Sequence, residues 1–220
     1  MNLSLFKRQK DQCDTCFGFQ TNNISEEYSA QIERKEAARA EKVNDKQRLE
    51  DSSNLKVVTL DLQAVLLCPL LKASALYYKT KLACHNFTIH DMKNRDVICY
   101  FWDETQGDLS ANSFASCLFD YIESLDNSIK EIIIHSDSCT YQNRNVTLCN
   151  AFVKNIIQKI LEKGHTQMEC DSVHCTIEHK IGNKLVHSPQ GYVDFIKSAR
   201  SGQPYTVKYL TYEFFKNFGD

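Results

Sequence analysis

The pattern of apolar and polar positions predicts an α/β domain over residues 55–220. The run 57–67 is apolar on both faces, which is typical of a strand at the centre of a sheet. Two stretches rich in β-branched and aromatic residues follow at 74–90 and 96–104, and the short turn between them favours antiparallel pairing. A fourth strand is expected at 131–135, where a run of isoleucines follows a charged residue.

Helical spacing of apolar residues predicts the helices that connect and follow these strands. An amphipathic helix is expected over 110–125, a short one over 145–156, and further helices over 168–181 and 191–200. The segment 157–163 fits either a strand or a continuation of the helix before it.

The order of these elements predicts an RNase H-like fold, a mixed sheet flanked by helices. Three strands and a helix come first, and strands and helices then alternate. In that fold an acid midway along the first strand lies beside an acid at the end of the fourth. A third acid from a later helix completes a cage for two Mg²⁺ or Mn²⁺ ions, which serve phosphodiester chemistry.

Acidic residues stand at the positions that this plan requires. Asp61 is the one charge in the first strand, and Asp137 follows the run of isoleucines. A carboxylate beside a buried strand is costly unless a cation meets it, so both are candidate catalytic residues and metal ligands. The alternatives are an Asp61 on the surface and an Asp137 that only caps the next helix. The third acid is expected to be Asp171, in the first turn of its helix, with Glu178, two turns later, as its substitute.

The polar turn after Asp137 offers a second kind of chemistry. Gln142, Asn143, Arg144 and Asn145 carry amide and guanidinium groups that suit phosphate. They are the candidate nucleic-acid-binding residues, with stabilisation of the loop itself as the alternative.

The first 54 residues form two further segments. Residues 1–22 contain Cys13 and Cys16 in a CxxC spacing, half of a zinc site, with no second CxxC and no histidine close in sequence. The remaining ligands would come from the fold or from upstream, and a chance CxxC is the alternative. Residues 23–54 predict a charged linker helix whose apolar stripe is too thin for many core contacts.

Cysteine and histidine recur between His165 and His179, where Cys170/His174 and Cys175/His179 have helical i,i+4 spacing. The two pairs cannot both face one ion on a straight helix, so no zinc site is expected there. His174 is expected to be a helix-face histidine satisfied by hydrogen bonds.

Composition limits the location and the partners. With a formal net charge of −2, any nucleic-acid surface must be local. No run reaches membrane-spanning length, and the start of the chain does not resemble a secretory signal. Ten cysteines without an export signal indicate intracellular thiols, hence a protein of the cytosol or nucleus.

Several strings also carry a family resemblance. They begin at Thr59 (TLDLQAVLLCP), Ser74 (SALYYKTKL), Asp137 (DSCTYQNRN) and Leu161 (LEKGHTQMECDSVH), and the KDQCDTC segment with its charged helix belongs with them. Together they resemble a largely uncharacterised family of transposon-derived animal proteins. The resemblance implies a DDE/D transposase core in which Asp61, Asp137 and Asp171 are the acids. Relatives extend further upstream and are longer between residues 145 and 158, so a short or missing fifth strand is expected here. Its loss would displace Asp171.

Three functions follow as expectations. The first is transposase-like, metal-dependent cleavage and strand transfer on DNA, in the nucleus, with homo-oligomerisation left open. The second is a catalytically inactive, domesticated DNA- or protein-binding module. The third is an RNase H-like nuclease that acts on RNA or RNA–DNA hybrids.

Overall fold

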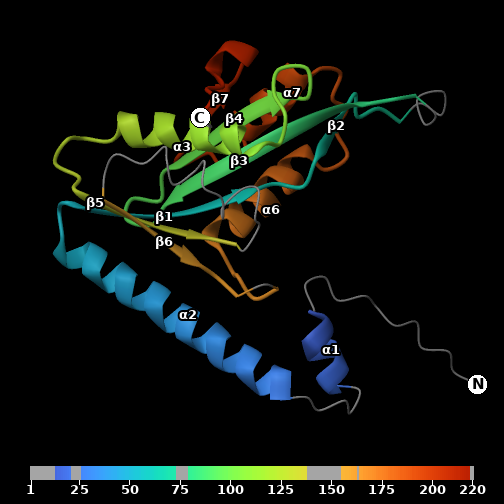
Figure 1. Cartoon of the computed structure of the whole chain (residues 1–220). Coiled ribbons are helices and arrows are strands. Elements are labelled where there is room, and N and C mark those ends of the chain that lie inside the picture. The colour runs from blue at the N-terminus through green and yellow to red at the C-terminus, as the bar shows by residue number, and fades with distance from the viewer. Residues whose placement is uncertain (1–12, 21–25, 73–78, 138–154, 163, 219–220) are drawn as a thin grey trace, which may run out of the picture.

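The computed structural model describes residues 13–20, 26–72, 79–137, 155–162 and 164–218, and their strands form a mixed seven-stranded sheet flanked by helices (Figure 1). This confirms the predicted α/β class. The strands are β1 (Leu55–Leu62), β2 (Leu66–Cys68), β3 (Leu82–Asp91), β4 (Val97–Asp103), β5 (Glu131–Ser136), β6 (Asn155–Ile160) and β7 (Thr206–Tyr209). The helices are α1 (Asp14–Gln20), α2 (Glu26–Asp51), α3 (Ala111–Ser124), α6 (Glu169–Ile181) and α7 (Pro189–Lys197), and a short 3₁₀ turn, η2 (Tyr212–Phe214), follows.

The strand order in the sheet is β6-β5-β1-β3-β4-β7, and β2 pairs with one end of β3. The pairing is parallel from β1 through β5 to β6 and antiparallel from β1 through β3 to β4. The last strand, β7, lies parallel to β4. The first strand of the domain is therefore a central strand, as its apolar pattern predicted.

Both faces of the sheet are covered, which explains why β1 is apolar on both sides. On one face Val58, Leu60 and Ile134 pack with Phe114 and Leu118 of α3. On the other face Cys99 and Phe101 of β4 pack with α6 and α7 through side chains that include Ile177 and Tyr192. Because successive side chains of a strand alternate between faces, each residue of β1 contributes to one core or the other.

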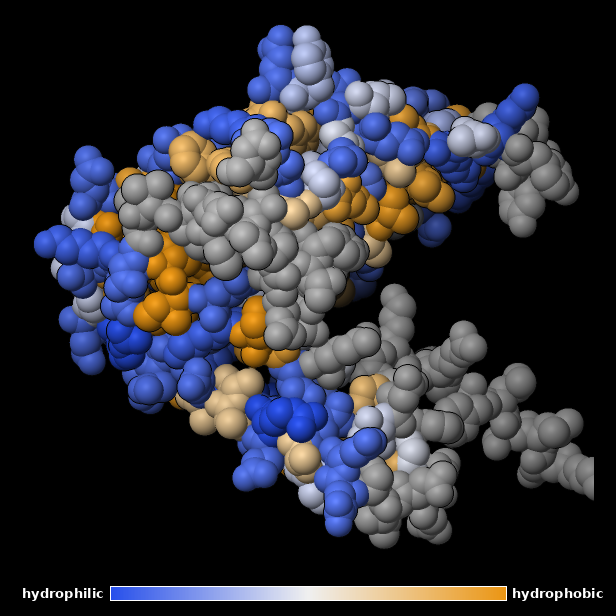
Figure 2. Space-filling view, viewed as in Figure 1, coloured by the Kyte–Doolittle hydropathy of each residue, from blue (hydrophilic) through white to orange (hydrophobic). Residues whose placement is uncertain are grey.

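The charged helix α2 lies along the sheet on the face that also holds α6 (Figure 1). Its Leu49 is 2% exposed and packs with Val57 of β1 and Ile133 of β5. Its Asp45 is 1% exposed, forms an ion pair with Lys159 at 2.8 Å and is hydrogen-bonded to Nε2 of His135 at 3.1 Å. The visible surface over α2 is otherwise largely hydrophilic (Figure 2). The helix thus makes more contacts with the sheet than the thin apolar stripe predicted, because one buried leucine and one buried ion pair anchor it.

Two further sequence predictions need correction. The run 57–67 was expected to be one strand, but β1 ends at Leu62 and β2 begins at Leu66. The fifth strand of the plan was expected to be short or missing, yet β6 spans six residues and pairs along the whole of β5. The short helix predicted over 145–156 lies mostly outside the described residues, and its last two positions belong to β6. Within the described ranges, no helix is both long enough and apolar enough to cross a membrane.

Candidate functional site

The strand register brings Asp61 and Asp137 to neighbouring positions. The parallel pairing of β1 with β5 ends with Thr59 opposite His135. Asp61 lies two residues beyond Thr59 in β1, and Asp137 lies two residues beyond His135, one residue past the end of β5. A step of two residues returns to the same face of a sheet, so Asp61 shares with Thr59 the face that α6 covers.

The first turn of α6 carries Asp171 to this face. Cys170 is fully buried, and its Sγ lies 3.5 Å from Oγ1 of Thr59, two residues before Asp61. This contact fixes the start of the helix against β1. The side chain of Asp171 accepts a hydrogen bond from the backbone N–H of Met168 at 2.8 Å, which caps the helix. Asp171 is otherwise exposed to solvent.

The electrostatics of Asp61 link the three acids. Its side chain is 20% exposed. Burial, and then the negative charges of Asp137 and Asp171, raise the pKa of Asp61 to about 7. Both kinds of cause disfavour the charged form of a carboxyl group. The charges of Asp137 and Asp171 therefore both act on Asp61.

The acidic arrangement is open. The ligand oxygens of Asp61, Asp137 and Asp171 are not all within 4.8 Å of one another. Among the described residues, one group of two cysteines and one histidine does meet this spacing. Glu178, proposed as the substitute third acid, is exposed on α6 two helical turns from Asp171. Of the two helical acids, Asp171 is the one whose charge raises the pKa of Asp61.

The side chain of His174 also lies beside Asp61, a contact that the sequence did not predict. Its Nε2 lies 3.0 Å from Oγ1 of Thr88 on β3, which confirms the expected hydrogen bond. Its Nδ1 lies 3.7 Å from Oδ2 of Asp61. Burial lowers the pKa of His174 to about 4, so the ring is neutral at physiological pH. The i,i+3 spacing of Asp171 and His174 on one helix was the available sequence signal.

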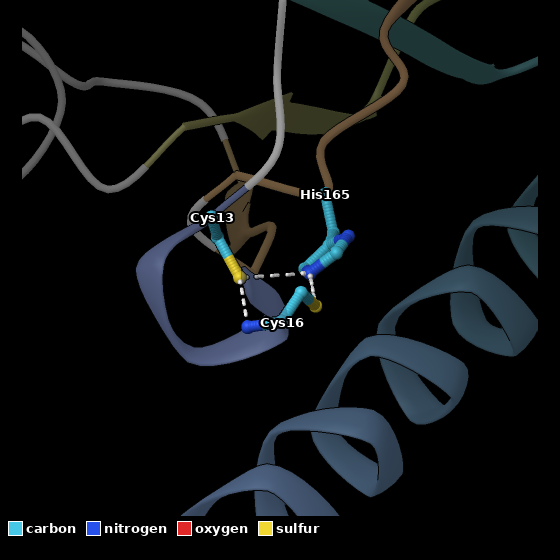
Figure 3. Close-up of side chains that lie close together, drawn as sticks. All are labelled: Cys13, Cys16 and His165. Atoms are coloured by element: carbon cyan, nitrogen blue, oxygen red, sulfur yellow. Dashed lines mark hydrogen bonds between the residues drawn. The ribbon is translucent and has the colours of Figure 1, made fainter. Parts of the chain in front are cut away.

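The second cluster is formed by Cys13, Cys16 and His165. The Nε2 atom of His165 lies 3.5 Å from Sγ of Cys13 and 3.3 Å from Sγ of Cys16. The backbone N–H of Cys16 donates to Sγ of Cys13 at 3.3 Å. Figure 3 shows the three side chains pointing toward one another, two from the N-terminal segment and one from the loop between β6 and α6. All three are half-buried, and their ligand atoms lie within 4.8 Å of one another.

The two thiols have different environments. Burial would raise the pKa of Cys13, but hydrogen bonds from Cys16 lower it below the usual value. Burial and the neighbouring Cys13 raise the pKa of Cys16. Cys13 is therefore the more acidic of the two thiols, and the thiolate is the form that binds soft metal ions.

Two hollows flank the loop between β6 and α6. A cavity of about 290 Å³ lies between this loop and α2, where four basic side chains (Lys35, Arg39, Lys42 and Lys46) line it together with Glu162 and Glu169. A cavity of about 400 Å³ on the same loop is lined by residues 164–167 and by Asp171. Both cavities are lined by His165, Thr166 and Gln167, so they adjoin each other. The basic side chains line the first cavity and Asp171 lines the second.

The remaining predicted residues, Gln142, Asn143, Arg144 and Asn145, lie outside the described residues. Comparison with known proteins does not place the chain in a family. No protein-family model matches the chain, and a search of curated proteins finds no match.

Proposed function

We propose that this protein carries out metal-dependent phosphodiester cleavage and strand transfer on DNA, with Asp61, Asp137 and Asp171 as its catalytic carboxylates. The observation that carries the proposal is the raised pKa of Asp61, about 7, which burial and the charges of the other two acids cause. Carboxylates that repel one another are stabilised when a cation binds between them.

The strand order supports an RNase H-like core. Leaving out β2 and β7, the order is β6-β5-β1-β3-β4, with β3 antiparallel to its neighbours and β5 and β6 parallel to β1. This is the plan that the sequence order predicted. In an RNase H-like core of this plan, the acid of the first strand lies beside the acid that follows the fourth strand, here β5.

The donor set fits Mg²⁺ or Mn²⁺. Carboxylate oxygens are the ligands that these hard ions prefer. Bound there, the ions would supply Lewis-acid activation of water or of a 3′-hydroxyl and stabilisation of the leaving oxygen. Asp61 would be ionised in that state, with the neutral ring of His174 nearby, its Nδ1 3.7 Å from Oδ2 of Asp61.

A phosphate-bearing substrate is favoured by the basic side chains of the cavity between α2 and the loop before α6, which adjoins the cavity that Asp171 lines. Four cationic side chains of α2 face the loop that leads into α6. Lysine and arginine groups bind nucleic acid mainly through its phosphates, without regard to sequence.

The experiment is a cleavage assay on labelled DNA with the full chain and 5 mM Mg²⁺ or Mn²⁺. Asp137→Asn is expected to reduce cleavage by at least about 100-fold, as loss of one strong catalytic group does elsewhere. Glu178→Gln, an exposed acid of the same helix as Asp171, is the matched control and should keep wild-type activity. Loss of activity in Glu178→Gln with retention in Asp171→Asn would contradict the assignment of the third acid.

A second candidate function is that of an inactive DNA- or protein-binding module. It is favoured by the helix-capping bond of Asp171, which occupies one carboxylate oxygen. DNA binding by the wild type, with no cleavage under any of these metal conditions, would select it. RNA and RNA–DNA hybrids in the same assay test the substrate preference.

A further inference from the structure

The geometry of Cys13, Cys16 and His165 corresponds to that of a zinc site. Zinc in proteins is tetrahedral, with Zn–S near 2.3 Å and Zn–N near 2.0–2.1 Å, so sulfur and nitrogen ligands of one ion lie about 3.5 Å apart. The two Sγ–Nε2 distances here are 3.5 and 3.3 Å. A single imidazole nitrogen at this distance from both sulfurs of a CxxC turn faces a shared point between them (Figure 3).

The backbone around His165 is adapted to this approach. Gly164 has a φ of +74°, a conformation that L side chains rarely adopt. A Cβ built on Gly164 would lie 2.9 Å from Cβ of Cys13. Only glycine therefore lets the loop come close enough for His165 to reach both sulfurs.

We propose that Cys13, Cys16 and His165 bind one zinc ion, which fastens the N-terminal segment to the loop between β6 and α6. The sequence indicated the two cysteines as half a site, and His165, 149 residues beyond Cys16, supplies the missing protein ligand. Three protein ligands leave the fourth position of the tetrahedron to water or to a donor outside the described ranges.

The zinc clasp, meaning Cys13, Cys16, His165 and their ion, acts on a loop that α2 already holds. Arg34 makes a two-pronged ion pair with Glu162, with N–O distances of 3.1 and 3.2 Å. Lys42 pairs with Glu169 at 2.7 Å. This loop leads directly into the first turn of α6. The clasp thus immobilises the entry to α6, whether or not the acids of the sheet are catalytic.

A redox-active dithiol is the competing interpretation of a CxxC turn. A dithiol needs no imidazole nitrogen between its sulfurs and no glycine at the close approach of a distant loop. The two interpretations make opposite predictions for a His165 variant, since removal of the imidazole removes a zinc ligand but leaves both thiols.

The test measures metal content of the reduced full-length protein by mass spectrometry after dialysis against metal-free buffer. Equimolar zinc is expected in the wild type and its loss in Cys13→Ser, Cys16→Ser and His165→Ala. Cys175→Ser and His179→Ala are the controls, since both residues are exposed on α6, and they should keep the metal. Circular dichroism of each variant checks that it is folded.

Cobalt replacement and hydrogen exchange complete the test. Co²⁺ added to metal-free wild type should give the thiolate charge-transfer and visible bands of a tetrahedral site, altered in His165→Ala. Removal of zinc should speed amide exchange in residues 164–171. A wild type that takes up neither zinc nor cobalt would overturn the proposal, and so would a folded His165→Ala that retains equimolar zinc with unchanged spectra. Neither result depends on DNA cleavage, so failure here is distinct from failure of the proposed function.

Discussion

At the scale of single residues, Asp61 and His174 form a pair whose titrations oppose each other. Burial and two acidic neighbours raise the pKa of Asp61 to about 7, and burial lowers the pKa of His174 to about 4. Below its folded pKa Asp61 is neutral, so its contribution to stability is present at low pH and is lost as the pH rises toward 7. His174 behaves in the opposite way: its contribution is present above its unfolded pKa of about 6.5 and is lost as the pH falls toward 4.

This opposition predicts a pH signature for Asp61→Asn in buffer free of divalent ions. Between pH 4 and pH 7 the wild type should gain stability from His174 and lose it from Asp61. The Asp61→Asn variant should gain stability from His174 in the same way but lose none at position 61. Its free energy of unfolding should therefore rise relative to wild type across this range, by as much as about 4 kcal/mol for a shift of about three pKa units. Urea unfolding at several pH values measures the difference, and a constant difference between the two proteins would show that Asp61 has an ordinary pKa.

The residue types of the site differ in how far sequence could predict them. Asp61 and Asp137 could be chosen because one is a charge within a buried strand and the other directly follows one, and the charge of Asp137 does act on Asp61. His165 could not be paired with Cys13 and Cys16, because 149 residues separate it from Cys16 and nothing local marks the contact. The contact of His174 with Asp61 depends on the rotation of α6 about its axis, which Cys170 sets by packing on Thr59.

At the scale of elements, α2 shows how a helix with a polar sequence can be anchored by few residues. Asp45 and Leu49 are one turn apart and almost fully buried, at 1% and 2% exposure. A periodicity argument averages over the helix and gives such a pair little weight, so the sequence predicted a linker. The partner of Asp45, His135, lies on β5 two residues before Asp137, which connects this helix to the acidic site.

The anchoring predicts a stability effect that a linker helix would not show. Leu49→Ala should lower the free energy of unfolding by about 2–4 kcal/mol, because it deletes a buried side chain packed between β1 and β5. Val43→Ala, on the same helix and 57% exposed, is the matched control and should change it by less than about 0.5 kcal/mol. Equal effects of the two substitutions in denaturant titrations would mean that α2 does not pack on the sheet in solution.

The strand β6 is the element for which the sequence expectation was least accurate. The sequence predicts a short or missing fifth strand after residue 145, and the segment 157–163 fits either a strand or a helix. Residues 155–160 form a strand because all six of them pair in parallel with the six residues of β5. The loop after β6 is thereby held where both His165 and Asp171 can reach their partners.

At the scale of the whole molecule, one loop connects two metal-binding proposals of different chemistry. Soft thiolate and imidazole ligands lie at its N-terminal side, and hard carboxylates lie at its C-terminal side, where α6 begins. These donor sets select different ions, zinc for the first and Mg²⁺ or Mn²⁺ for the second. The zinc clasp would order the loop, and the ordered loop would hold Asp171 near the two strand acids.

The central claim, that Asp61, Asp137 and Asp171 together hold divalent ions, is tested most directly by calorimetric titration of Mn²⁺ into the zinc-loaded protein. We expect saturable binding, weakened by at least about tenfold in Asp137→Asn and unchanged in Glu178→Gln. Binding should also stabilise the fold by mass action, by about 1.4 kcal/mol when free Mn²⁺ is ten times Kd. Binding of Mn²⁺ to Asp137→Asn with wild-type affinity, or no binding to the wild type at millimolar Mn²⁺, would contradict the account.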